Sequence, residues 1–147
     1  MSEAITARWT PRQADFDRFA RLSGDDNPIH VNPAFSAHTA FGRTVAHGML
    51  LYSRVWALVV AARPGGRHVS QSLMFPTPAY ADEELAIAIW PKKGASPIVL
   101  ANVAPEERTL LATEGQGRDA ILYAIRVARV RDGAEVLTGE CTLEEHC

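Results

Sequence analysis

The sequence predicts an α+β fold in which an antiparallel sheet curls around one long apolar helix. Apolar residues at helical spacing are confined to the first part of the chain, up to Ala62. From His68 onward apolar and polar residues alternate, which is typical of strands with one buried face. The dipeptide Asp132-Gly133 lies between two alternating segments and indicates a hairpin turn.

Size and composition favour one globular domain over residues 1–147. Hydrophobic residues make up 47% of the chain and charged residues 22%, as in ordinary globular proteins. The net charge of −2 argues against a general nucleic-acid binder or a binder of anionic membranes. The longest apolar stretch, 55–62, is too short to span a bilayer, and the first residues do not resemble a signal peptide. We therefore expect a cytoplasmic protein.

Local signals define the first elements. Residues 2–9 are expected to form a short strand, and a helix follows in which Thr10 caps, Pro11 takes the first position and Gln13 completes a capping box. The apolar face of this helix consists of Phe16, Phe19 and Ala20. Gly24 is placed to end it. A second cap at Asn32 predicts a short helix through about His38.

The third predicted helix, His47 to Ala62, is apolar on nearly all sides and is therefore expected to be buried. The strands that follow are predicted at His68–Phe75, Leu85–Trp90, Ile121–Val130 and Ala134–Leu143. The segment 92–118 is harder to interpret, with candidate strands at Pro97–Val103 and Thr109–Thr113.

The most informative motif is Ser23-Gly24-Asp25-Asp26-Asn27-Pro28-Ile29-His30. It places a carboxylate and an imidazole five residues apart on a turn-forming loop, where the pair can hold and activate one water. Seventeen residues after His30, His47-Gly48 opens the apolar helix, where free backbone N–H groups can bind a carbonyl oxygen or an anion. The two motifs predict a site that adds water to, or removes it from, an activated carbonyl compound.

These motifs, with Ala34-Phe35, Ala40-Phe41-Gly42 and Val45-Ala46-His47-Gly48-Met49-Leu50, resemble the MaoC-like hydratases. That family includes (R)-specific enoyl-CoA hydratases and 3-hydroxyacyl-thioester dehydratases. The resemblance is dense from about Phe16 to Ala62 and weaker beyond. It implies a hot-dog fold, with the sheet wrapped around one long central helix, and a homodimer.

The resemblance also implies residue roles. Asp25 and His30 match the catalytic pair, which holds the water that adds to C3 of a trans-2-enoyl thioester; the reverse reaction dehydrates a 3-hydroxyacyl thioester. Gly48 matches the residue whose N–H binds the thioester oxygen. Asn27 matches a residue that shapes the loop between Asp25 and His30. The substrate is carried on coenzyme A or on the phosphopantetheine of an acyl carrier protein, and no cofactor is expected.

Three further residues are candidates for substrate binding, each with an open alternative: His47, Ser53 and Trp56. His47 is either catalytic or packed at the helix start, and Ser53 faces either the pocket or a partner subunit. Trp56 either restricts the acyl channel or lies in the core.

No metal site is expected, because His38, His68 and His146 share no ligand spacing. The only two cysteines, Cys141 and Cys147, form no CxxC motif and are expected to be a reduced core thiol and a terminal thiol. The basic residues Arg63, Arg67, Lys92 and Lys93 are either contacts for the carrier's phosphates or a scattered solvated surface. The segment 92–118, longer than in small hydratases, is expected to hold longer strands, an extra hairpin or a lid.

Two other functions stay open. A hot-dog thioesterase commonly uses a carboxylate from the central helix, and His47 to Ala62 contains no Asp or Glu. A non-catalytic acyl-thioester-binding subunit would not need Asp25, His30 and Gly48 together. The sequence does not specify acyl chain length and branching, the carrier, or the physiological direction.

Overall fold

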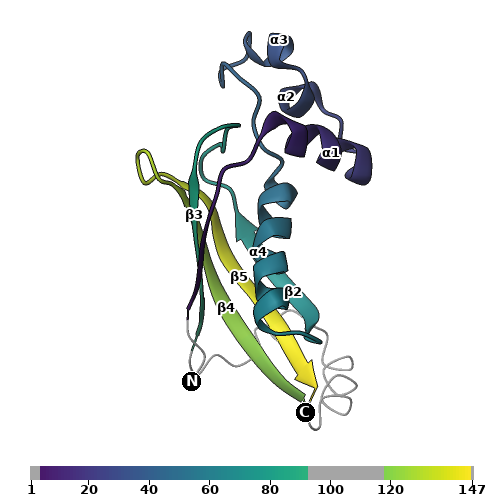
Figure 1. Cartoon of the computed structure of the whole chain (residues 1–147), viewed down its shortest axis with the longest axis vertical. Helices are drawn as coiled ribbons and strands as arrows, with labels where there is room; N and C mark the ends of the chain where they lie inside the picture. Colours follow the sequence, from purple (N-terminus) through teal and green to yellow (C-terminus); the bar gives the residue numbers. More distant parts are fainter. Residues whose placement is uncertain (1–3, 93–117, 147) are drawn as a thin grey trace, which may run out of the picture.

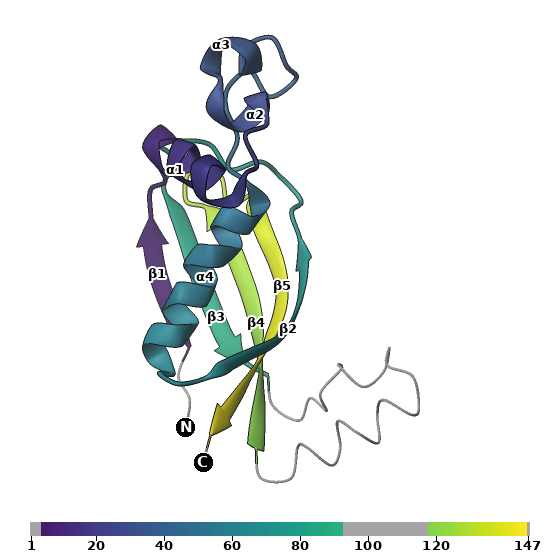
Figure 2. The same ribbon diagram turned by 90° about the vertical axis from the view of Figure 1, so that its right-hand side faces the viewer.

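The computed structural model describes residues 4–92 and 118–146, which form one antiparallel sheet and four helices (Figure 1). In chain order the elements are β1 (Ile5–Trp9), α1 (Gln13–Ser23), α2 (Pro28–Val31), α3 (Pro33–Ser36), α4 (Gly48–Ala62), β2 (Arg67–Met74), β3 (Leu85–Pro91), β4 (Arg118–Arg129) and β5 (Glu135–His146). The strand order in the sheet is β1-β3-β4-β5-β2. The sheet curves around α4, and α1, α2 and α3 lie beyond the N-terminal end of α4 (Figure 2). The predicted α+β architecture is therefore confirmed.

The core lies between the sheet and one face of α4. Leu51, Tyr52, Val55 and Val59 are the buried residues of that helix. They pack with the inward side chains of the sheet, whose cross-strand pairs include Ile87 with Val127 and Ile89 with Ile125. Burying these apolar groups on one face of an amphipathic sheet is the main favourable contribution to folding.

The prediction that α4 is buried is confirmed for only one of its faces in the chain as described. Met49 is 44% exposed and Val60 is 38% exposed, and the side chains of Ser53 and Ala57 between them are also exposed. These four positions share one face of the helix. A single sheet can cover only the opposite face, so this one faces outward.

The predicted start of α1 is wrong. Arg12 is extended at the N-cap, and its N–H donates to the Asp15 carboxylate at 2.7 Å, so the helix begins at Gln13 rather than at Pro11. The backbone carbonyl of Pro11 instead accepts the N–H of Asp82 at 2.8 Å, which keeps this residue in the connection to the sheet. The predicted end is confirmed: Gly24 has φ +81°, where a glycine is favoured.

Most other elements follow the sequence signals. Asn32 caps α3, accepting the Phe35 N–H at 3.0 Å, although the helix ends at Ser36. The four-residue helix α2 was not predicted, although Asn27-Pro28 repeats the signal of Asn32-Pro33. The hairpin between β4 and β5 is confirmed, with Gly133 at φ +73°.

Several sequence expectations fall outside the described residues. They are the candidate strands at Pro97–Val103 and Thr109–Thr113, the basic residue Lys93 and the terminal thiol of Cys147. Cys141 is a buried free thiol in β5, and burial raises its pKa to about 11. In the described ranges, no helix is both long enough and apolar enough to cross a membrane.

Candidate active site

A cavity of about 450 Å³ lies where α1, α2 and the N-terminal end of α4 meet. Most of its lining is apolar. The lining residues are Phe19, Asp25, His30, Phe41, Val45, Ala46, His47, Gly48, Met49, Leu51, Phe75, Pro76, Thr77, Pro78, Ala79 and Val136. Three of the residues singled out from the sequence, Asp25, His30 and Gly48, therefore face one cavity, and so does His47.

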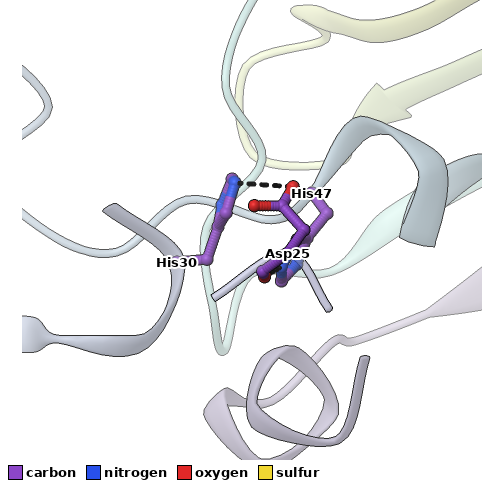
Figure 3. Close-up of side chains that lie close together, drawn as sticks. All are labelled: Asp25, His30 and His47. Atoms are coloured by element: carbon purple, nitrogen blue, oxygen red, sulfur yellow. Dashed lines mark hydrogen bonds and ion pairs between the residues drawn. The ribbon is translucent and has the colours of Figure 1, made fainter. Parts of the chain in front are cut away.

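Asp25 and His30 come together because the chain reverses between α1 and α2. Gly24 turns the backbone, and the hydroxyl of Ser23 accepts the N–H of Asp25 at 3.1 Å. The amide oxygen of Asn27 accepts the Ile29 N–H at 3.1 Å and caps α2, on which His30 lies. Asp25 Oδ2 and His30 Nε2 are then 3.8 Å apart (Figure 3). This distance is too long for a hydrogen bond, but both groups can hydrogen-bond one water.

His30 is held by the backbone around it. Its side chain is largely buried, and Nδ1 lies 2.8 Å from the carbonyl oxygen of Val45. A carbonyl oxygen only accepts, so Nδ1 carries the proton in the neutral ring and Nε2 has the lone pair. The nitrogen that can take up a proton is therefore the one that faces Asp25.

Gln13 supports His30 from α1, a role that the sequence did not suggest. Its Nε2 donates to the carbonyl oxygen of His30 at 2.8 Å. Its Oε1 accepts the hydroxyl of the buried Thr44 at 2.5 Å. Gln13 thus bonds α2 and the segment before α4, rather than completing the predicted capping box.

His47 is the N-cap residue of α4 and is 2% exposed. Its ring stacks on His30, with centroids 3.8 Å apart and planes at 25°, and the ring of Phe19 contacts it at 4.8 Å. Nε2 lies 2.9 Å from the backbone carbonyl oxygen of Asp25. Burial lowers the pKa of His47, the hydrogen bond to Asp25 opposes this in part, and the neighbouring His30 lowers the pKa further.

Gly48 is the first residue of α4, so its N–H has no acceptor within the helix. The ring of Phe75 packs directly on this residue: a Cβ added at Gly48 would lie 2.7 Å from Phe75 Cζ. A larger residue at this position would therefore have to displace the ring of Phe75. The segment 75–78, which follows β2, also lines the cavity, and no sequence motif identified it.

The other candidates lie apart from the cavity. Ser53 is exposed and donates to the Met49 carbonyl oxygen at 2.7 Å, in a separate groove with Trp9 and Leu50. Trp56 is half-buried and contacts the ring of His68 at 4.6 Å. In the described chain neither one lines the cavity with Asp25, so their part in substrate binding stays a prediction.

Asp25, His30 and His47 are also the one group of described residues whose potential ligand atoms lie close enough for a metal, all within 4.8 Å of one another. In each imidazole one nitrogen lies against a backbone carbonyl oxygen and the other is left over, an arrangement that metal-binding histidines also have. The expectation that no metal binds here therefore stays a prediction.

The basic residues considered as phosphate contacts are mostly paired with acids. Arg63 lies 3.1 Å from Glu145, Arg67 lies 2.6 Å from Glu144, and Lys92 pairs with Glu140. Arg63 caps the C-terminal end of α4, whereas the cavity lies at the N-terminal end. The described chain thus favours the interpretation of a solvated surface for these residues.

Comparisons with known proteins identify the family and the fold. Residues 2–107 match the family model of the MaoC like domain. The chain is 41% identical over 78 residues to an (R)-specific enoyl-CoA hydratase of Aeromonas caviae, covering 52% of this chain and 58% of the relative. It therefore spans less than two thirds of that relative's length. It is 31% identical over 122 residues to a 3-hydroxybutyryl-CoA dehydratase of Methylorubrum extorquens, covering 80% of this chain and 71% of the relative.

The fold is similar to a solved structure of the A. caviae (R)-hydratase involved in PHA biosynthesis. The TM-score is 0.76 at 26% identity, over 96% of this chain and 92% of the other. The expected hot-dog fold is confirmed by this likeness. Since the family model covers more than half of the sequence, and the Methylorubrum relative is matched over most of its length, the chain belongs to the MaoC-like domain family.

Proposed function

We propose that the protein catalyses the reversible hydration of trans-2-enoyl thioesters to 3-hydroxyacyl thioesters. The observation that carries the proposal is one apolar cavity that contains the Asp25 carboxylate, the Nε2 of His30 and the first residue of α4. The names of the relatives, hydratase and dehydratase, support the same class of reaction.

In the hydration direction, a water held between Asp25 and His30 gives up a proton as its oxygen bonds to C3. The electron pair of the C2–C3 double bond moves toward C2 and the thioester carbonyl, forming an enolate-like oxygen. The N–H of Gly48 donates to that oxygen, and the positive end of the helix dipole adds to the stabilisation. A proton then returns to C2, so that atoms and charge balance. Asp25 and His30 share the transfer, since a water between the two groups, 3.8 Å apart, would be within reach of both.

The proposed substrate is an acyl thioester of coenzyme A or of a phosphopantetheine carrier, whose acyl chain enters the apolar part of the cavity. Addition of water to a polarised double bond involves no net oxidation or reduction, so we propose that no cofactor takes part.

We also propose a homodimer. The exposed face of α4 with Met49 and Val60, and the outer edge of β2 at one end of the described sheet, are surfaces that a second copy would cover. Location in the cytoplasm stays a prediction from the sequence.

The test is loss of the enoyl-thioester absorbance with crotonyl-CoA and longer enoyl-CoAs, with mass measurement in solution for the dimer. Asp25→Asn and His30→Ala are expected to abolish turnover. Asp26→Asn and His38→Ala are matched controls, because both side chains are exposed and outside the cavity. They are expected to retain turnover.

Other outcomes would contradict the proposal. Turnover that survives both substitutions would place the site elsewhere. Release of free thiol without loss of the double bond would indicate a thioesterase, against which α4 counts because Gly48–Ala62 contains no acid. If the protein binds enoyl thioesters, whether carried on coenzyme A or on an acyl carrier protein, but turns none of them over, it is a binding subunit.

A further inference from the structure

His47 contacts both members of the Asp25–His30 pair through two different parts of its ring. One ring nitrogen bonds to the backbone of Asp25, and the ring face stacks on His30. Figure 3 shows the three side chains gathered at one point, where the loop before α2 meets the start of α4. Sequence reasoning left open whether His47 is catalytic or merely packed at the helix start.

We propose that His47 is a positioning residue: a neutral imidazole that anchors the backbone of Asp25 and orients the ring of His30 for proton transfer. The inference rests on the proposed function, because it concerns the same site. It assigns His47 no direct contact with the reacting atoms.

The protonation state of His47 follows from its partners. The carbonyl oxygen of Asp25 only accepts, so Nε2 of His47 carries the proton. Its Nδ1 is buried and has no hydrogen-bond partner among the described residues. A second proton there would be a buried charge without an acceptor, next to a second imidazole. The pKa of His47 is lowered for these reasons, and the ring is neutral near pH 7.

Stacking on His47 fixes the orientation of the His30 ring, which the hydrogen bond of His30 alone does not. His30 is tied through Nδ1 to the Val45 carbonyl oxygen, and a ring held by a single bond can still tilt around it. The face of His47, 3.8 Å away, blocks that tilt from one side. Phe19 on α1 contacts the ring of His47 in turn, so α1 supports His47, and His47 at the start of α4 restricts the ring of His30. Nε2 of His30 therefore stays directed at Asp25.

The neutral state also suits the chemistry. When His30 takes a proton from water, positive charge forms beside the ring of His47. A neutral neighbour does not oppose that charge, whereas a protonated one would repel it. The positioning role and the charge that forms on His30 therefore both require a neutral His47.

Three substitutions separate the two contacts. His47→Phe keeps a flat ring against His30 but removes the donor to Asp25. His47→Gln keeps an N–H donor and removes the ring, and His47→Ala removes both. We expect kcat to fall by about tenfold or more in the first two and further in the third, with smaller changes in KM. His38→Phe, an exposed histidine outside the cavity, is the matched control and is expected to behave like the wild type.

The second readout does not depend on activity. In protein labelled with ¹⁵N-histidine, the His30 ring is expected to show one tautomer with the proton on Nδ1. His47→Ala is expected to shift these signals toward an average of both tautomers, while His47→Phe preserves them. A role limited to packing would lower the melting temperature and leave the signals and the kcat of the folded protein unchanged.

The proposal is overturned if folded His47→Ala keeps kcat within about threefold of the wild type, or if its His30 signals are unchanged. The two hypotheses fail in different ways. Absence of turnover in the wild type would refute the hydratase proposal, and the tautomer measurement would still decide whether His47 orients His30.

Discussion

Gly48→Ala tests whether the start of α4 binds the thioester oxygen. The added methyl group would lie 2.7, 2.8 and 2.9 Å from three carbon atoms of the Phe75 ring. Ordinary contact begins near 3.4 Å, so the ring must move by about 0.7 Å. Phe75 is 45% exposed, and its ring can turn toward solvent. The methyl group would remain beside the N–H that the substrate oxygen has to approach.

The expected effects on stability and on rate are very different in size. Alanine is favoured over glycine in a helix by at most about 1 kcal/mol, and moving Phe75 offsets part of this gain. The free energy of unfolding should therefore change by no more than about 1 kcal/mol. Displacing the oxygen from its donor should cost roughly 3–4 kcal/mol in the transition state, so kcat/KM should fall about a hundred- to a thousandfold.

The assay is the rate of enoyl-thioester loss, together with urea unfolding of the same variants. Phe75→Ala and the double variant Gly48→Ala/Phe75→Ala form the matched set. If the methyl group blocks the donor, the double variant stays far below Phe75→Ala alone. If it acts only by pushing the ring of Phe75 into the cavity, removing that ring restores the rate. A folded Gly48→Ala protein with kcat/KM within about threefold of the wild type would refute the assignment of Gly48.

Three further predictions concern the same fold. Asn27→Ala and Asn32→Ala each remove a side-chain cap, with bonds of 3.1 and 3.0 Å, and each should cost about 1 kcal/mol in unfolding free energy. Only Asn27→Ala should also lower kcat, by about tenfold, because its loop joins the proposed catalytic pair; equal rates for the two variants would contradict this. Lowering the pH below about 6.5 should reduce stability, since the unfolded chain binds a proton at His47 that the native state, with its lowered pKa, does not. The pH-dependent difference between the wild type and His47→Phe in urea unfolding isolates this contribution, and parallel curves would count against it. Finally, Gly139 has φ +155°, and an added Cβ would lie 2.0 Å from the Ser72 carbonyl oxygen in the neighbouring strand, so Gly139→Ala should destabilise by about 3 kcal/mol or more. A melting temperature like that of the wild type would show that the strands can separate there.

Local sequence signals determined the elements that depend only on interactions between residues close in sequence. The hairpin at Asp132-Gly133, the end of α1 at Gly24 and the cap at Asn32 each depend on conformations or bonds within a few residues. Apolar spacing likewise gave the extent of α4. The spacing of Asp25 and His30, together with the family resemblance, identified residues that the structure brings to one cavity.

Other features were decided only by the tertiary structure. They depend on partners that no side-chain pattern in the sequence identifies. The position of Pro11 in the connection to the sheet depends on a backbone bond from Asp82, far along the chain, to the carbonyl of Pro11. The tautomers of His30 and His47 depend on carbonyl oxygens, which every residue carries and which no pattern distinguishes. The stacking of the two imidazoles and the packing of Phe75 on Gly48 arise where segments distant in sequence meet. A sequence specifies which groups can take part in such contacts, but their orientation is set by the packing of the elements that hold them.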